Sequence, residues 1–139
     1  MYSNRIVKPK VRHLMPLGVL SSLSGKWGTH DFTFLSVYRP PDDTENPISL
    51  RKLVSGKLGK DMEGVFWDRL MDAMESGVVL ACGDLNLSPS KLDDKLKDFG
   101  RLARRIPFDG EYHSFLRWDS VNKFLQRTSI DHLISNGLT

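Results

Sequence analysis

The hydrophobic positions at the start of the chain follow extended rather than helical spacing. The apolar stretch 18–23 predicts a strand, and two glycines bracket residues 24–29, which we interpret as a turn. Residues 32–38 are rich in β-branched and aromatic types and apolar on both faces, which predicts a buried strand. Pro40 and Pro41 end this strand, because proline cannot donate to a strand ladder.

Helical spacing appears after a polar connection. Residues 42–60 are polar and contain Pro47, so we expect a long surface connection with a short helix near residues 50–54. From Asp61 onwards, apolar residues recur at helical spacing, and Gly77 is placed to end that helix. The inward positions of this helix are predicted to be Met62, Phe66, Leu70 and Ala73.

A second alternation of strand and helix follows. Residues 78–82 form a continuous apolar run, and after a helix such a run predicts a central strand of a sheet. Apolar spacing predicts a helix over residues 90–103, a loop over 106–110 and a last strand over 129–135. Strands that alternate with helices favour a layered α/β arrangement, in one domain that covers residues 1–139.

Composition narrows the class of protein without specifying a function. Hydrophobic residues at 40% and charged residues at 27% indicate a globular chain and not a disordered one. The net charge of +3 is compatible with a polyanionic partner such as nucleic acid, although many proteins without such a partner share it. The single Cys82 excludes an internal disulfide. No segment is apolar enough to span a membrane or to act as a secretory signal, so we expect an intracellular protein, with the nucleus as one candidate compartment.

The clearest chemical motif is Gly83-Asp84-Leu85-Asn86, directly after the apolar run. A carboxylate at the C-terminal end of a strand is held rigidly, which suits a base that activates water. An amide two residues further on faces the same side of an extended chain, so Asn86 could donate to a phosphate oxygen. The alternative is a turn in which the aspartate accepts a hydrogen bond from its own backbone.

Two further polar elements fall at strand ends. The hydroxyl of Tyr38 and the guanidinium of Arg39 could bind phosphate, or these residues could simply end a strand before a proline turn. Asp131 interrupts an apolar strand, where an ionised carboxylate needs a partner. It could orient a catalytic histidine, or it could pair with a nearby arginine or with backbone. Adjacent strand residues face opposite sides, so His132 is not expected to share a site with Asp131.

In this order, the three elements resemble the endonuclease/exonuclease/phosphatase family, over residues 17–135. The chain looks most like the endonuclease domains of LINE-type retrotransposons, in which a Tyr-Arg-Pro-Pro form, a helix, G-D-x-N and S-x-I-D follow in turn. A short aromatic strand near residues 112–115 fits the same branch. The resemblance implies a DNase I-like α/β (α+β) fold, a two-sheet β-sandwich flanked by helices, of which this chain would be a part.

The resemblance also implies metal-dependent hydrolysis of phosphodiesters, with Mg²⁺ as cofactor, DNA as the favoured substrate and a linked reverse transcriptase. Tyr38 would contact the phosphate, Asp84 would activate the attacking water, and Asn86 would hold the phosphate and the transition state. Asp131 would orient the family's catalytic histidine, and Arg39 would join Asn86 in substrate binding.

The sequence departs from the family pattern at both ends. No strand with the family's asparagine or with its metal-binding glutamate is recognisable before Leu14, Asn4 included, and no Ser-Asp-His element follows Ser135. The metal ligands are therefore unassigned. The alternatives are a non-catalytic relic or nucleic-acid-binding fragment, and a phosphatase or phospholipase of the same family. We expect exposed strand edges that favour self-association. Two basic clusters could follow a nucleic-acid backbone or be solvated surface: Arg101, Arg104 and Arg105, and Lys57 and Lys60.

Overall fold

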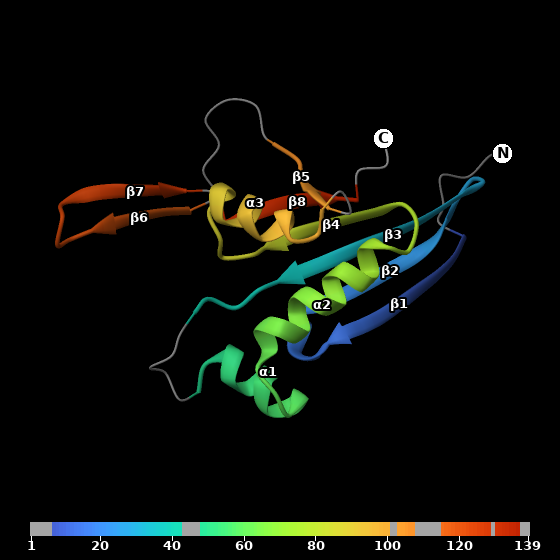
Figure 1. Cartoon of the computed structure of the whole chain (residues 1–139), viewed down its shortest axis with the longest axis horizontal. Helices are drawn as coiled ribbons and strands as arrows, with labels where there is room; N and C mark the ends of the chain where they lie inside the picture. Colours follow the sequence, from blue (N-terminus) through green and yellow to red (C-terminus); the bar gives the residue numbers. More distant parts are fainter. Residues whose placement is uncertain (1–6, 43–47, 101–102, 108–114, 129, 137–139) are drawn as a thin grey trace.

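The computed structural model describes residues 7–42, 48–100, 103–107, 115–128 and 130–136, and is mixed α/β (Figure 1). A six-stranded sheet has the strand order β1-β2-β3-β4-β8-β5, and β6 and β7 form a separate hairpin that projects away from it. The strands are β1 (Val7–Met15), β2 (Leu20–Trp27), β3 (His30–Tyr38), β4 (Val79–Asp84), β5 (Arg104–Arg105), β6 (Phe115–Asp119), β7 (Phe124–Thr128) and β8 (Asp131–Ser135). The helices are the 3-10 helix η1 (Pro16–Gly18), α1 (Leu50–Leu58), α2 (Met62–Met74) and α3 (Pro89–Lys97).

The only parallel pair in the six-stranded sheet is formed by β3 and β4, as far as the described residues show. A parallel pair requires a crossover connection, and α1 and α2 supply it. This crossover places α2 over the same face of the sheet as α3 (Figure 1). The arrangement agrees with the predicted layered α/β class.

The core lies between this face of the sheet and the helices. Phe66 and Leu70 of α2 are fully buried, as the helical spacing predicted. On the strands, burial alternates, because successive side chains point to opposite faces. The buried strand residues of the helix-covered face are Leu20, Leu35, Val37, Val79, Ala81 and Ile134.

The opposite face of the sheet is exposed in the described structure. Phe34 and Tyr38 of β3 are 37% and 36% exposed, and Val11 of β1 is 66% exposed. The prediction that residues 32–38 are buried on both faces is therefore wrong, since helices cover only one face. The expected self-association stays a prediction, which this apolar face favours.

Other sequence predictions fail at element ends. Strand β2 continues to Trp27, so the turn is only Gly28 and Thr29, because residues 24–27 gain ladder hydrogen bonds to β3. Helix α1 extends to Leu58 beyond the predicted residue 54, and its Ser49 hydroxyl caps the Lys52 amide. Helix α3 ends at Lys97 and not at residue 103, because the left-handed Gly100 (φ 61°) turns the chain.

Strand β1 was not predicted at all. Its Lys8, Pro9, Lys10 and Arg12 lack the apolar alternation of a strand. The strand lies at an edge of the sheet, where charged residues and proline hinder pairing with another chain. Asn4, Arg101, residues 112–114 and Ser129 lie outside the described residues.

Candidate active site

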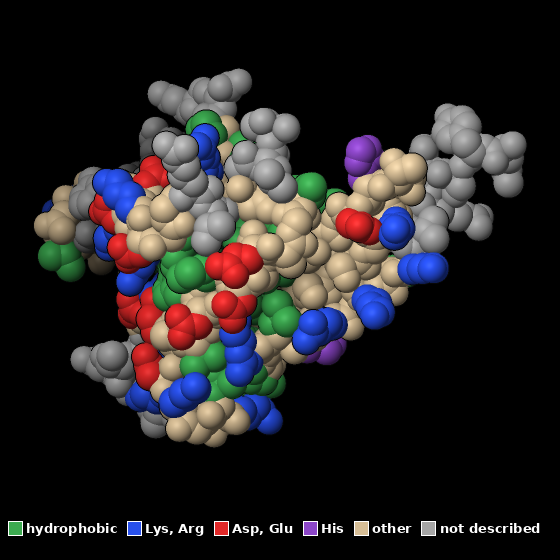
Figure 2. Space-filling model, turned by 45° about the vertical axis from the view of Figure 1, so that its right-hand side comes forward, with side chains coloured by type: hydrophobic (Ala, Val, Ile, Leu, Met, Phe, Trp, Pro, Cys, Tyr) green, Lys and Arg blue, Asp and Glu red, His purple; other side chains and the backbone are tan. Residues whose placement is uncertain are grey.

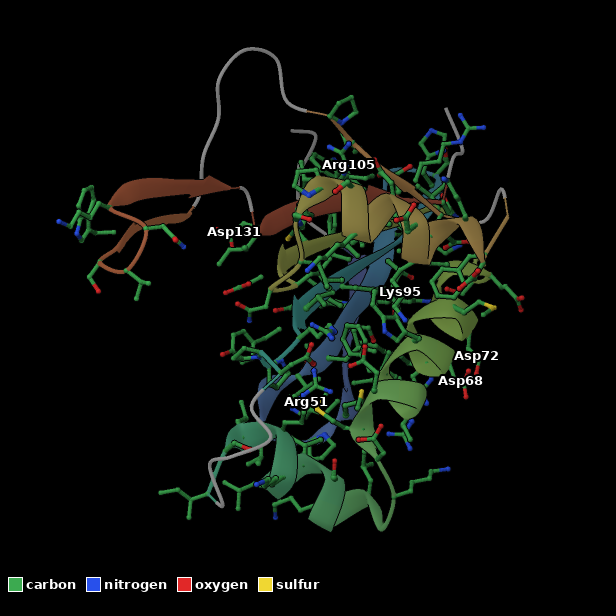
Figure 3. The ribbon with its side chains drawn as sticks, turned by 60° about the vertical axis from the view of Figure 1, so that its left-hand side comes forward. Arg51, Asp68, Asp72, Lys95, Arg105 and Asp131 are labelled. Carbon is green, nitrogen blue, oxygen red and sulfur yellow. The ribbon has the colours of Figure 1, made fainter. Side chains whose placement is uncertain are left out.

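Three of the predicted catalytic residues form one row across neighbouring strands. Tyr38 of β3 is in register with Asp84 of β4, and Asp84 is in register with Asp131 of β8. Residues in register share a face of the sheet, and this is the face away from the helices. Tyr38 and Asp84 end their strands while Asp131 begins its strand, so the row lies along one edge of the sheet. Figure 3 shows Asp131 at the end of β8 nearest to the β6–β7 hairpin.

The close approach of β3 and β4 explains the glycine of the Gly-Asp-Leu-Asn motif. Gly83 has φ of 146°, which disfavours any side chain. A Cβ atom at this position would lie 1.9 Å from the carbonyl oxygen of Val37. A glycine here therefore brings the backbone of Asp84 against the end of β3 beside Tyr38.

The motif continues as a turn that the sequence left as the alternative. The backbone amide of Asn86 donates to Oδ1 of Asp84 at 2.9 Å. The backbone of Asn86 is in the left-handed region, with φ of 50°. Asn86 is therefore not extended, contrary to the geometry that we predicted. Its Nδ2 donates to the carbonyl oxygen of Arg39 at 2.8 Å, which leaves a second N–H on the same nitrogen.

Arg39 is only 4% exposed, and its guanidinium is used inside the protein. It donates to both oxygens of Glu63 at 3.0–3.2 Å, to Asp42 at 3.3 Å and to the Leu85 carbonyl at 3.3 Å. Its backbone amide donates to the carbonyl oxygen of Asp84 at 2.8 Å. The structure therefore assigns Arg39 to holding the motif turn, where we had predicted a direct contact with phosphate.

Glu63, which sequence reasoning missed, is the acceptor at the centre of this network. Trp67 Nε1 donates to it at 2.9 Å and Arg51 Nη1 at 2.9 Å, in addition to Arg39. Burial alone would raise the pKa of the Glu63 carboxyl, but these hydrogen bonds from Trp67, Arg39 and Arg51 lower it to about 2. The only sequence signal was an acidic residue in the first turn of a helix, four positions before a tryptophan.

The pKa of the Asp84 carboxyl is shifted in the opposite direction to that of Glu63. Partial burial raises its pKa above the usual value, the hydrogen bond from Asn86 opposes that rise, and the charge of Asp131 adds to it. A raised pKa makes the carboxylate a better proton acceptor near neutral pH, as a general base requires.

His132 lies on the other face, as the strand alternation predicted. It is 3% exposed, and its Nε2 donates to the Leu87 carbonyl oxygen at 2.7 Å. The histidine that the resemblance pairs with Asp131 is therefore not its neighbour in the sequence.

The two acidic residues at this edge are of the type that binds magnesium. Magnesium is commonly held by one or two carboxylates together with waters and substrate phosphate. Asp131 and Asp84 lie side by side across two strands, whereas the described residues contain no group of three or more His, Cys, Asp or Glu that could hold a metal. The metal ligands therefore stay unassigned within the described residues.

The predicted basic clusters are only partly free for a ligand. Arg105 of β5 donates to both carboxylate oxygens of Asp93 at 2.9–3.0 Å, and Figure 3 shows it beside α3. Arg104, Lys57 and Lys60 are exposed. No helix in the described part of the chain is long and apolar enough to cross a membrane.

Comparison with solved structures identifies the fold. An "endonuclease/exonuclease/phosphatase family protein from Leptotrichia buccalis C-1013-b" matches with a TM-score of 0.56 and 12% identity, over 96% of this chain and 50% of that chain. The chain has the endonuclease/exonuclease/phosphatase fold. This fold agrees with the predicted DNase I-like class, with one six-stranded sheet described here.

Two further matches are weaker. D. rerio TDP2, complexed with single-strand DNA product, matches with a TM-score of 0.48 and 15% identity, over 95% of this chain and 53% of that one. TDP2 from C. elegans matches with a TM-score of 0.46 and 19% identity, over 96% of this chain and 41% of that one. The chain thus spans about half the length of these proteins. No protein-family model and no curated protein matches the sequence.

Proposed function

We propose that this chain carries the reacting centre of a metal-dependent phosphodiesterase that acts on DNA. The observation that supports this most is the row of Tyr38, Asp84 and Asp131, in register along one edge of an endonuclease/exonuclease/phosphatase fold. The order of Tyr38-Arg39-Pro40-Pro41, Gly83-Asp84-Leu85-Asn86 and Ile130-Asp131 favours an endonuclease of the LINE retrotransposon type.

The residues of the row would divide the chemistry of hydrolysis. Asp84, with its raised pKa, would take the proton of the attacking water. The second N–H of Asn86 and the hydroxyl of Tyr38 would donate to phosphate oxygens, where negative charge increases in the transition state. Asp131 would orient a catalytic histidine, as the resemblance implies, and the chemistry that Mg²⁺ would supply when bound is to neutralise phosphate charge.

The arginine–glutamate network would keep this arrangement rigid without touching the substrate. The Arg39 carbonyl fixes the Asn86 side chain, and the Arg39 amide fixes the Asp84 backbone. Because Glu63 holds the Arg39 guanidinium, and Arg39 donates to the Leu85 carbonyl, this side chain connects helix α2 to the motif turn. A preformed donor at Asn86 costs less reorganisation when charge develops on the phosphate.

A second candidate is a nucleic-acid-binding fragment without hydrolysis. It is favoured by the absence of a third metal-ligating side chain at the row, within the described residues. A Mg²⁺-dependent cleavage assay separates the two candidates. Labelled DNA, an inositol polyphosphate and sphingomyelin vesicles are incubated with the chain and with Asp84→Asn. Cleavage of DNA that the variant loses supports the nuclease, and cleavage of another substrate moves the proposal to that class. Binding of DNA without cleavage supports the second candidate.

A further inference from the structure

A polar groove lies on the helix side of the sheet, beside the C-terminal half of α2. Its volume is about 850 Å³, and residues of β1, β2, β3 and α2 line it. Most of its lining residues are charged or carry hydroxyl groups. They include Arg12, Ser22, Ser24, Lys26, Thr33 and Arg69.

The floor of the groove is a set of hydroxyl groups in register. Ser24 of β2 is paired with Thr33 of β3, and Ser22 lies two residues before Ser24 on the same face. Arg12 of β1 is paired with Ser22, so a guanidinium stands at one end of the hydroxyl row. Lys26 lies two residues beyond Ser24 and places an ammonium group at the other end.

The cations of the groove exceed its carboxylates. Lys8, Arg12, Lys26 and Arg69 line it, against Asp31 and Asp72. Lys26 and Asp31 are 3.8 Å apart and both exposed, so their ion pair is weak. Neither Lys8 nor Arg12 forms an ion pair within the described residues. Figure 2 shows several Lys and Arg side chains along this end of the molecule.

We propose that this groove binds the sugar–phosphate backbone of a nucleic acid. Arg, Lys, Ser and Thr are the side chains that most often contact phosphate oxygens in such complexes. None of the described lining residues is Phe, Tyr or Trp, and His13 is the one aromatic ring among them, so contact with the backbone should dominate over base stacking. Contact with the backbone alone is independent of base sequence.

The length of the groove also suits a polymer. Lys26 lies four residues beyond Ser22 along β2, about 13 Å at the usual strand rise. A single small phosphate would leave most of the groove empty.

The groove lies on the opposite face of the sheet from Asp84, so it would hold a different part of the polynucleotide from the one that is cleaved. The choice of a nucleic acid rests on the proposed function, but the binding itself needs no hydrolysis. The test below is made in EDTA, which removes the metal that the proposed hydrolysis requires. Failure of groove binding can therefore be distinguished from failure of the proposed hydrolysis.

The experiment is a fluorescence-anisotropy titration of the 139-residue chain with labelled single-stranded oligothymidylate, at several NaCl concentrations. The variant Arg12→Gln/Lys26→Gln removes two exposed cations of the groove. The control Lys91→Gln/Lys97→Gln removes the same charge from exposed positions on α3, outside the groove and outside both predicted basic clusters. Thermal unfolding of each variant checks that the fold is retained.

We expect the groove variant to bind about tenfold more weakly. We also expect its slope of log affinity against log salt to fall by about 1.4, since each lost contact to a single strand removes about 0.7. The control should bind within about twofold of the unchanged chain. Wild-type affinity in the groove variant, equal weakening in the control, or equal competition by polyglutamate would each overturn the proposal.

Discussion

Asp84 on β4 lies directly opposite Asp131 on β8, in the antiparallel register of the two strands. Like charges that face each other across strands destabilise a sheet, and the partial burial of Asp84 adds to this cost. A pair of this kind weakens the fold in the absence of a ligand. Its place at the edge of the sheet, beside Tyr38, is what a reacting centre for phosphate esters would use.

Removing the charge of Asp84 should stabilise the protein. The folded-state pKa of Asp84 is raised, so its destabilising effect appears as pH rises above the usual value of 3.8 and is complete above the raised pKa. Asp84→Asn should therefore increase the free energy of unfolding at pH 7 by about 0.2–1 kcal/mol, the range for opposed cross-strand pairs. Urea unfolding at pH 7 and pH 3 measures this, and an increase of equal size at both pH values would contradict it.

Glu63→Gln, in contrast, should decrease the free energy of unfolding. It leaves the buried Arg39 guanidinium with a neutral partner, and we expect a loss of about 2–3 kcal/mol at pH 7. The folded-state pKa of Glu63 is about 2, against 4.5 as its usual value. The stability it contributes is present above pH 4.5 and lost as pH falls through 2. The difference from the unchanged chain should therefore shrink between pH 4.5 and pH 2.

Asp42→Asn is the control for that measurement. Asp42 contacts the same Arg39 guanidinium, but its side chain is 75% exposed. Its loss should change the free energy of unfolding by less than about 0.5 kcal/mol. An equal effect of the two variants would show that Glu63 is not the centre of the network.

Gly83→Ala should disrupt the contact between β3 and β4. The added methyl group would meet the Val37 carbonyl at 1.9 Å, so the strands must separate, and we expect a loss of about 3 kcal/mol or more. Gly56→Ala is a matched control, since Gly56 lies in α1 with no atom within 4 Å of the new Cβ. This control should stabilise by about 0.5–1 kcal/mol. Equilibrium unfolding in urea compares the two, and a small effect of Gly83→Ala would disprove the close approach.

Two substitutions of Asn86 separate its backbone role from its chemical role. Asn86→Gly accepts the left-handed backbone and removes only the amide side chain, whereas Asn86→Ala adds strain at φ of 50°. We expect both variants to lose about 100-fold or more in the rate of DNA cleavage. In addition, Asn86→Ala should be less stable than Asn86→Gly by about 1 kcal/mol. Full activity of Asn86→Gly would remove Asn86 from the site.

The sequence predicted those parts of the molecule whose side chains follow the period of one element. Met62, Phe66 and Leu70 marked α2, and the apolar run before Asp84 marked β4. Strand β1 escaped prediction because an exposed edge strand needs no apolar alternation. The roles of Arg39 and Glu63 escaped it because they depend on a contact between residues 24 positions apart, which no local pattern encodes.

The sequence predicted which residues would form the candidate site better than it predicted their geometry. Tyr38 and Asp84 were predicted at the ends of apolar runs, whereas Asp131 was predicted inside a strand over residues 129–135 and in the structure begins β8. At Asn86 we predicted an extended chain with a turn as the alternative. The structure shows the turn, in which the backbone amide of Asn86 donates to Oδ1 of Asp84. The retrotransposon type stays a prediction.

The most direct test of the proposed function is the rate of Mg²⁺-dependent cleavage of labelled DNA by the chain and by Asp84→Asn. We predict cleavage that EDTA abolishes, and a loss of about 100-fold or more in the variant, whose fold should be slightly more stable than that of the unchanged chain. Such a loss cannot come from unfolding. Equal rates for the two proteins, or no cleavage by either under conditions where both bind DNA, would contradict the hydrolytic role of Asp84.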